Sequence, residues 1–271
     1  MNRDVMETVL KKTAPIATDP GFRLPSLGEC ALLLDIDGTL LDLAPSPHEV
    51  RVPSKLAKAL PALLQRTNGA LALVSGRSLS DIDRIFTPML FPAVGGHGAE
   101  MRISVESEAV ASRAPPMNPD LIRRFAAIAA LSAGILVEDK GYSLALHFRR
   151  APDAEKSIYD AVSAIRADLP NAPIEVLPGK LVCEIKHSGF TKATGVTELM
   201  AHEPFKGRRP IFIGDDITDE TVFAIMPDMK GLSFSVGRHA KGVDGHFNAP
   251  RDVRTWLSQL LEGEGSAAGR A

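Results

Sequence analysis

The sequence predicts an α/β protein: a doubly wound, Rossmann-like core built on a parallel sheet, with an inserted α+β cap domain of antiparallel sheet and two helices. Two observations support this fold class. In residues 29–114, and again in 187–262, strand-like apolar runs alternate with helix-like amphipathic stretches, which is the order of parallel β-α units. Residues 115–186 instead follow the order helix, strand, strand, helix, strand, strand, which indicates two helices on one face of an antiparallel sheet. The core domain is therefore expected to come from two separate stretches of chain.

The first stretch of the core opens with the apolar run CALLLDI, which we interpret as a strand. A helix opened by a proline is predicted from Pro53 to Gln65, and ALALVS is predicted as the next strand. Ser78, with Asp81 three residues later, is a candidate N-cap for the helix that follows. The run FPAVGGHGAE is then expected to form a strand and a turn.

The second stretch of the core repeats this alternation. It predicts a helix over 192–201, the strand PIFIGD, a helix from about Asp219, the strand GLSFSV and a final helix over APRDVRTWLSQLLE. The insertion begins after a break at PPMNPD. Its elements are expected at 121–132 and 153–168 for the helices, and at 135–138, 142–149, 173–177 and 180–186 for the strands.

Alternation within two strands of the insertion predicts which face of its sheet is buried, because successive side chains point to opposite sides. We expect the apolar face to pack on the two helices. The polar face is either solvated or covers a polar ligand. The apolar set is Leu144, Leu146, Phe148, Leu181, Cys183 and Ile185, and the polar set is Ser143, His147, Arg149, Lys180, Glu184 and Lys186.

Composition narrows the class of function. The chain has 271 residues, of which 45% are hydrophobic and 24% charged, as in a soluble globular protein. A net charge of −2 argues against nucleic acid or an anionic membrane as the partner, and no run is apolar enough to span a bilayer. Cys30 and Cys183 do not suggest a disulfide framework or a zinc site. We expect a cytoplasmic protein, with residues 1–28 as a leader and 263–271 as a disordered tail.

Carboxylates follow the first predicted strand of the core. Asp35 and Asp37 stand at the end of CALLLDI, and ligands bind outside the carboxyl ends of strands in an open parallel sheet. Removing a carboxylate from water without a partner costs several kcal/mol, so a buried acid here indicates a bound cation. The structural alternative is an Asx turn at Asp37-Gly38.

Two further candidate residues lie at the end of a predicted core strand and at the start of a predicted core helix. Ser75 ends the next strand, where a hydroxyl and a main-chain N–H can hold a phosphate oxygen, although Ser-Gly is also ordinary turn chemistry. Lys192 lies in the first turn of a predicted helix, where a cation is disfavoured by the helix dipole unless an anion binds there. An exposed, solvated lysine is the plain alternative.

A second acidic cluster, in FIGDDITDETVF, ends another apolar strand. Asp215 and Asp216 stand at the strand end, and Asp219 is either a supporting acid or a helix cap. Because the carboxyl ends of parallel strands meet at one edge of a sheet, we expect Asp35 and Asp215 to converge. Such a site is rich in oxygen, as Mg²⁺ requires.

Together these motifs resemble a known family. Acid, Ser, Lys and Gly-Asp-Asp, in that order, are similar to the four motifs of the haloacid dehalogenase superfamily of aspartate-nucleophile phosphohydrolases. DIDGTL, SGR, GGHG, VEDK, LALHFR, PGKLVCEIK and GDDITDE resemble more closely the trehalose-6-phosphate phosphatases, over about residues 30–260. The resemblance implies a cap in 115–186, Mg²⁺ as cofactor and trehalose 6-phosphate as substrate. It also suggests functional coupling to a trehalose-6-phosphate synthase.

The resemblance also implies roles for individual residues. Asp35 would be the nucleophile and Asp37 the general acid and base. Ser75 and Lys192 would bind the phosphate. The implied metal ligands are Asp35, the main chain of Asp37, Asp215 and Asp216, with Asp219 in support, and the implied substrate-binding residues are Gly76, Arg77, His97, Glu138, Lys140, Lys180 and Glu184.

Two positions depart from the family pattern, and three other functions stay open. Thr191 stands where Asn or Asp is common, and KHSGF replaces a usual Arg-Pro, which leaves Lys186 without a clear role. The alternatives are a phosphatase for another phosphorylated sugar or glycoside, a phospho-accepting signalling module, and an inactive partner of a trehalose-synthesising enzyme. Asp37 and the large insertion favour hydrolysis over signalling, and the complete set of reacting groups argues against an inactive relic.

Overall fold

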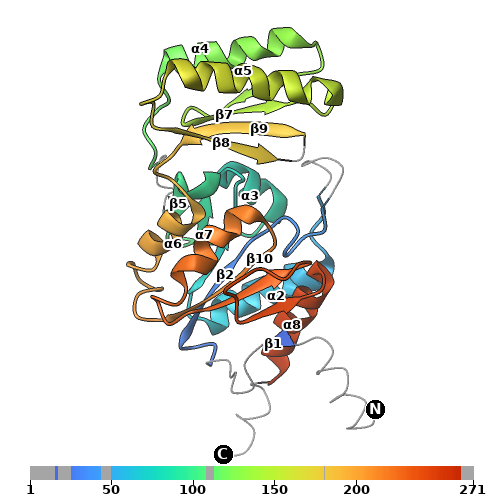
Figure 1. The fold of residues 1–271 in the computed structure, drawn as a ribbon. Helices are drawn as coiled ribbons and strands as arrows, with labels where there is room; N and C mark the ends of the chain where they lie inside the picture. Colours follow the sequence, from blue (N-terminus) through green and yellow to red (C-terminus); the bar gives the residue numbers. More distant parts are fainter. Residues whose placement is uncertain (1–15, 18–25, 44–49, 108–112, 180, 264–271) are drawn as a thin grey trace, which may run out of the picture. The chain divides into compact units, whose positions relative to one another are not determined.

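The structure is a computed structural model, and it describes residues 16–17, 26–43, 50–107, 113–179 and 181–263. The chain divides into two compact units, Met1–Ala111 with Thr191–Ala271, and Ser112–Phe190. We call the first the core unit and the second the cap unit (Figure 1). No helix among the described residues has the length and apolar character needed to cross a membrane.

The core unit contains an eight-stranded sheet in the order β1-β12-β11-β10-β2-β3-β4-β5. Six neighbouring strands, from β12 to β4, are parallel, and the edge strands β1 and β5 are antiparallel. The strands are β1 (Ile16–Ala17), β2 (Cys30–Leu34), β3 (Leu71–Val74), β4 (Ala93–Gly95), β5 (Glu100–Arg102), β10 (Arg209–Gly214), β11 (Leu232–Val236) and β12 (Gly245–Phe247).

Helices cover both faces of this sheet, which confirms the doubly wound prediction. Every residue of β2 is buried, and its side chains alternate between two apolar clusters, with Leu32 in one and Leu33 in the other. The first cluster includes side chains of α2 (Ser54–Arg66), α3 (Leu79–Phe86) and α8 (Pro250–Gly263). The second includes side chains of α6 (Lys192–Leu199) and α7 (Ile217–Ile225).

Local capping follows the sequence where it was predicted. Ser78 is the N-cap of α3, and its hydroxyl accepts a hydrogen bond from the main-chain N–H of Asp81. Thr191, which stands where Asn or Asp is common, caps α6 through a reciprocal pair of bonds with Thr194, a role that was not predicted from the sequence.

The cap unit is an α+β module with its own apolar core. Its sheet is antiparallel throughout, in the order β6-β7-β9-β8, and the apolar face packs on two helices as the alternation predicted. Leu144, Leu146, Phe148, Cys183 and Ile185 are fully buried there. The elements are α4 (Pro119–Ala126), the 3₁₀ turn η2 (Ala127–Leu131), β6 (Leu136–Asp139), β7 (Ser143–His147), the 3₁₀ turn η3 (Pro152–Ala154), α5 (Glu155–Asp168), β8 (Ile174–Gly179) and β9 (Val182–His187).

Three strands of the core were not predicted. β12 and the edge strands β1 and β5 are only two or three residues long and carry no apolar run that separates them from loops. β1 lies inside the predicted leader and pairs with β12, so part of that segment belongs to the core sheet. Most of the leader, and the tail from residue 264, lie outside the described residues.

Candidate active site

The two acidic strand ends predicted to converge come from neighbouring strands. β2 and β10 lie side by side, and the main-chain N–H of Asp35 donates to the carbonyl of Ile213 at 3.0 Å. The helix after β2 packs on one face of the sheet and the helix after β10 on the other. Asp35 and Asp215 therefore stand at the point where the winding of the sheet reverses, the usual ligand position in such folds.

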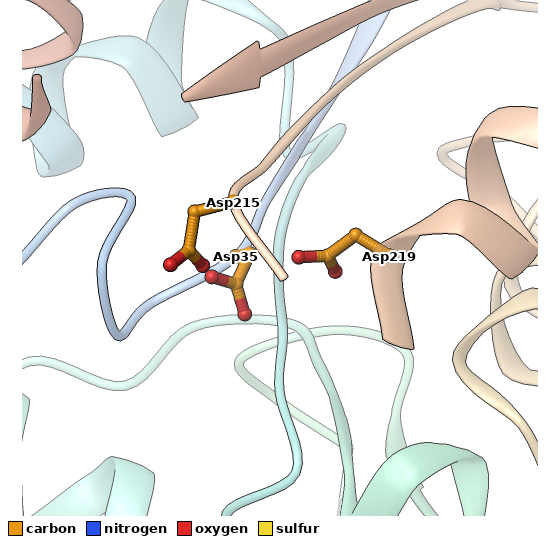
Figure 2. Close-up of side chains that lie close together, drawn as sticks. All are labelled: Asp35, Asp215 and Asp219. Atoms are coloured by element: carbon orange, nitrogen blue, oxygen red, sulfur yellow. The ribbon is translucent and has the colours of Figure 1, made fainter. Parts of the chain in front are cut away.

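Three carboxylates meet at this edge (Figure 2). Asp35, Asp215 and Asp219 each contribute an oxygen, and these oxygens lie within 4.8 Å of one another. Asp219 rather than Asp216 completes the group. Asp216 is exposed and acts as the N-cap of α7, with its carboxylate accepting from the N–H of Ile217 at 2.7 Å. The structure therefore brings Asp219, and not the carboxylate of Asp216, together with Asp35 and Asp215, while the predicted metal ligands stay a prediction.

Lys192 lies among these acids. Its Nζ donates to Asp35 Oδ1 and to Asp219 Oδ1, each at 2.8 Å, and its side chain is only 4% exposed. Burial alone would lower the pKa of Lys192, but the charges of Asp219 and Asp35 outweigh it and raise the pKa above its usual value. The ammonium is therefore charged, and it neutralises one of the three carboxylates.

The remaining negative charge is poorly compensated. Burial raises the pKa of Asp35 well above its usual value; Lys192 opposes this, and the charges of Asp219 and Asp215 add to it. Burial, and then the charges of Asp219 and Asp216, raise the pKa of Asp215 to about 6. Asp35 Oδ2 is buried without a hydrogen-bond partner in the described structure. An orphaned oxygen beside two further carboxylates fits a divalent cation.

Gly38 shows how closely the site is packed. A Cβ at this position would lie 2.0 Å from Asp215 Oδ2, and the backbone φ is +80°, which disfavours any side chain. The DIDGT turn can therefore lie against Asp215 only because it carries glycine.

Asp37 is held by Arg77. Both carboxylate oxygens accept from the guanidinium, Oδ2 from Nε at 2.5 Å and Oδ1 from Nη2 at 2.7 Å. Arg77 follows β3, which neighbours β2, so the strand pairing brings the two motifs together. Arg77 was expected to bind substrate, and the structure gives its guanidinium a partner within the site.

The serine and glycine motifs also lie together. The Ser75 hydroxyl, 2% exposed as a residue, accepts from the main-chain N–H of Arg77 at 3.1 Å. The Ser75 carbonyl accepts from the N–H of His97. A Cβ on Gly76 would lie 2.4 Å from His97 Nε2, so the His97 ring stands directly over the SGR turn.

In the cap unit, the predicted sugar-binding residues lie on the polar face of the sheet. Glu184 Oε1 accepts from the Ser143 hydroxyl at 3.0 Å and lies 3.6 Å from Lys140 Nζ. Glu138 Oε2 lies 2.8 Å from His147 Nε2, and this hydrogen bond lowers the pKa of Glu138. Lys180 lies outside the described residues.

Sequence reasoning assigned no role to Ser143 or His147, although their strand parity placed them on this face. The alternation of side chains along the strand was the only feature of the sequence that placed these two residues on the polar face. Lys186, whose role was open, is 4% exposed and donates to Glu175 at 2.8 Å and to the Phe190 carbonyl at 2.5 Å, so its ammonium is used inside the cap unit.

Comparison with known proteins identifies the family of the chain. The family model described as trehalose-phosphatase matches residues 33–254. The chain belongs to the trehalose-phosphatase family. It is 34% identical over 244 residues to trehalose-6-phosphate phosphatase of Escherichia coli (strain K12), covering 90% of this chain and 91% of that protein. It is 40% identical over 215 residues to the probable trehalose-phosphate phosphatase of Sinorhizobium fredii, covering 78% and 79%.

Solved structures of the same family share the fold. The C-terminal domain of C. albicans trehalose-6-phosphate phosphatase matches with a TM-score of 0.73 and 22% identity, covering 86% of this chain and 92% of that one. At that identity the match supports the fold alone: a doubly wound parallel-sheet core with an inserted α+β domain, as the sequence predicted.

Proposed function

We propose that this member of the trehalose-phosphatase family hydrolyses trehalose 6-phosphate to trehalose and inorganic phosphate, through an aspartyl-phosphate and with Mg²⁺. The observation that carries the proposal is the buried Asp35, which has one oxygen on Lys192 and the other without a hydrogen-bond partner in the described structure. A buried carboxylate beside the fixed ammonium of Lys192 can offer one oxygen to a divalent cation and the other to phosphorus, as a covalent phosphoryl transfer requires.

In the first step, an Asp35 oxygen attacks the phosphorus and the bond from phosphorus to the sugar oxygen breaks. Asp37, protonated on an oxygen that has then released Arg77, gives that proton to the sugar oxygen, and trehalose leaves. In the second step, Asp37 takes a proton from a water molecule that attacks the phosphorus, which releases phosphate and restores Asp35. Ser75 and Lys192 would hold phosphoryl oxygens through both steps.

The candidate ligands of Mg²⁺ are the carboxylates of Asp35, Asp215 and Asp219, with the main-chain carbonyl of Asp37. A bound Mg²⁺ supplies positive charge that stabilises the transferring phosphoryl group. Lys192 cannot supply all of this charge, because its ammonium already bridges two of the carboxylates.

Substrate choice is proposed to lie with the polar face of the cap sheet. The residues Glu138, Lys140 and Glu184, together with Lys180 from the resemblance, offer acceptors and donors for sugar hydroxyls. A second phosphate would call for a basic cluster instead. Gly76 and His97 stay proposed substrate-binding residues of the core. We further infer a cytoplasmic location and coupling to the synthase that must supply trehalose 6-phosphate.

The test is phosphate release from a panel of sugar phosphates, with and without a chelator. We expect trehalose 6-phosphate to be the best substrate and chelator to abolish turnover. Asp35→Asn should be folded and inactive, whereas Asp37→Asn, given the good leaving group of 4-nitrophenyl phosphate, should accumulate phosphorylated protein. A different best substrate would replace trehalose 6-phosphate in the proposal, and full activity of Asp35→Asn would exclude the aspartyl-phosphate.

A further inference from the structure

Arg238 contacts the segment that carries Asp215. The residue follows β11, and its guanidinium donates from Nε to the main-chain carbonyl of Asp215 at 2.7 Å and from Nη2 to that of Asp216 at 2.9 Å. Its third nitrogen, Nη1, donates to Glu220 Oε1 at 2.7 Å. One side chain therefore binds the end of β10 and the first turn of α7.

The geometry of these bonds suits arginine in particular. Two carbonyls of consecutive residues are bound by two nitrogens of one planar group, a fork that lysine cannot reproduce. The segment between β10 and α7 is only two residues long, so fixing both of its carbonyls fixes its main chain.

The main chain of Arg238 is itself anchored to the sheet. Ser235, fully buried on β11, donates its hydroxyl to the carbonyl of Arg238 at 2.7 Å. The neighbouring Gly237 donates its N–H to the carbonyl of Phe247 on β12 at 2.9 Å. These two hydrogen bonds attach the main chain at Arg238 to β11 and β12, so the guanidinium extends from a fixed position on the core sheet.

The Asp215 carboxylate itself is only weakly held by hydrogen bonds. It accepts a hydrogen bond from Thr39 Oγ1 at 3.4 Å, which is too long to fix its position firmly. The neighbouring carboxylates of Asp219 and Asp216 also repel it. Repulsion would drive the segment outwards unless its main chain were restrained.

We infer that Arg238 is a positioning residue for the divalent cation, holding the carbonyls of Asp215 and Asp216 so that the Asp215 carboxylate stays in ligand position beside Asp35. This inference rests on the proposed metal site, but not on the identity of the sugar substrate. Nothing in the sequence motifs points to Arg238, which lies outside all of them.

The charge effect of substituting Arg238 changes the Mg²⁺ affinity in a known direction. Removing a positive charge near a cation site, and leaving Glu220 without this ion pair, would by themselves strengthen Mg²⁺ binding. Loss of positioning would weaken it. The two effects therefore act in opposite directions, and weaker binding can be assigned to position rather than to charge.

The experiment is calorimetric titration of the metal-free protein with MgCl₂, for wild type, Arg238→Ala, Arg238→Lys and Arg209→Ala. Arg209 is a matched control because it also donates to one main-chain carbonyl, that of Lys230 at 2.7 Å, from the opposite end of β10. Partners that orient metal ligands typically contribute 10- to 100-fold in affinity, so we expect Arg238→Ala to raise the Kd for Mg²⁺ by about 10-fold or more. Arg209→Ala should leave it unchanged.

Arg238→Lys guards against a variant that fails to fold, because it keeps the positive charge and loses only the fork. We expect an intermediate Kd, and a kcat that returns to the wild-type value when Mg²⁺ is raised. Wild-type affinity in Arg238→Lys, or unchanged or tighter binding in Arg238→Ala, would overturn the inference while leaving the phosphatase proposal in place. A wild-type protein that binds no Mg²⁺ would instead overturn the metal proposal and this inference with it.

Discussion

The Asp37 carboxylate is held at both oxygens by the Arg77 guanidinium, at 2.5 Å and 2.7 Å, although the residues are 40 positions apart. A bidentate pair of this kind fixes the direction of the carboxylate as well as its place. Asp37 is the proposed proton donor to the leaving sugar, so the pairing gives Arg77 a testable effect on one substrate class and not on another.

Arg77→Ala should therefore act through the leaving group. A sugar alkoxide needs a proton as it departs, whereas 4-nitrophenolate does not. Since general acid catalysis contributes about 10²- to 10⁴-fold, we expect a loss of about 100-fold or more in kcat for trehalose 6-phosphate. The loss for 4-nitrophenyl phosphate should be much smaller. Arg84→Ala, which removes an exposed ion pair with Asp81, is the control. Equal losses on both substrates would contradict a role through Asp37.

Gly38→Ala should destroy the proposed cation site without unfolding the protein. Its Cβ would meet Asp215 Oδ2 at 2.0 Å, so the carboxylate must move. Gly207→Ala is a matched control because φ is +76° there, close to +80° at Gly38, and no atom lies within 4 Å of its added Cβ. Both variants should lose about 1 kcal/mol of stability for the left-handed backbone, and Gly38→Ala should lose somewhat more because its Cβ also displaces the Asp215 carboxylate. Thermal unfolding and Mg²⁺ titration separate the two effects, and comparable Mg²⁺ affinity in both variants would contradict the prediction.

Asp215 should make the metal-free protein less stable at neutral pH than at mildly acidic pH. Burial and the charges of Asp219 and Asp216 raise its pKa from 3.8 to about 6. Between about pH 4 and pH 6 the folded chain binds more protons at this group than the unfolded chain, so its contribution to the free energy of unfolding falls as the pH rises. Asp215→Asn should therefore raise the Tm of metal-free protein at pH 7, and remove the further rise that Mg²⁺ gives to wild type.

Asp216→Asn is the control for Asp215→Asn. It removes one charge from the adjacent position and keeps a residue that caps α7 well. Differential scanning calorimetry with EDTA and with Mg²⁺ measures both effects. A lower Tm for Asp215→Asn at pH 7 would show that the carboxylate stabilises the metal-free fold, contrary to the expectation.

Lys192→Met should abolish turnover and destabilise the metal-free protein. Its ammonium bridges Asp35 and Asp219 in a buried position, and removing one partner of a buried ion pair typically costs about 3–5 kcal/mol. Mg²⁺ should recover part of that loss, because a second cation can replace some of the missing charge. Chemical denaturation with and without Mg²⁺ measures both the loss of stability and its recovery. A variant with the same free energy of unfolding as wild type in EDTA would be inconsistent with this account.

Glu184→Ala should impair selectivity more than chemistry. The carboxylate accepts from Ser143 and lies beside Lys140, so its removal leaves two donors of the polar face without that acceptor. We expect kcat/KM for trehalose 6-phosphate to fall by about 10-fold or more, since unpaired polar groups weaken binding strongly. Hydrolysis of 4-nitrophenyl phosphate should stay near wild type. Asp160→Ala, on the exposed side of α5, is the control in the same unit, and a parallel decline on both substrates would remove this face from the specificity proposal.

The sequence predicted most of the fold because its signals are local. Alternation in β7 and β9 identified the apolar face of the cap sheet, and acids at the ends of β2 and β10 indicated one edge of the core. Convergence of Asp35 and Asp215 followed from the parallel sheet alone.

The third acid of the group, Asp219, was harder to predict from the sequence because its position depends on where a helix begins. We expected a helix from about Asp219, but α7 begins at Ile217. That two-residue difference makes Asp216 the N-cap and turns the Asp219 side chain back toward the site, where it binds Lys192. The pairing of Arg77 with Asp37, and the contact of Arg238 with the Asp215 segment, depend on strand register and loop geometry, for which a single sequence carries no signal.

The bridge from Lys192 to Asp35 and Asp219 has a consequence for how the polypeptide matures. With an internal counterion already between two of the acids, Asp35 and Asp219 can lie together without a metal ion. The Mg²⁺ of the proposed mechanism can therefore bind after the chain has folded, and its removal need not unfold the protein.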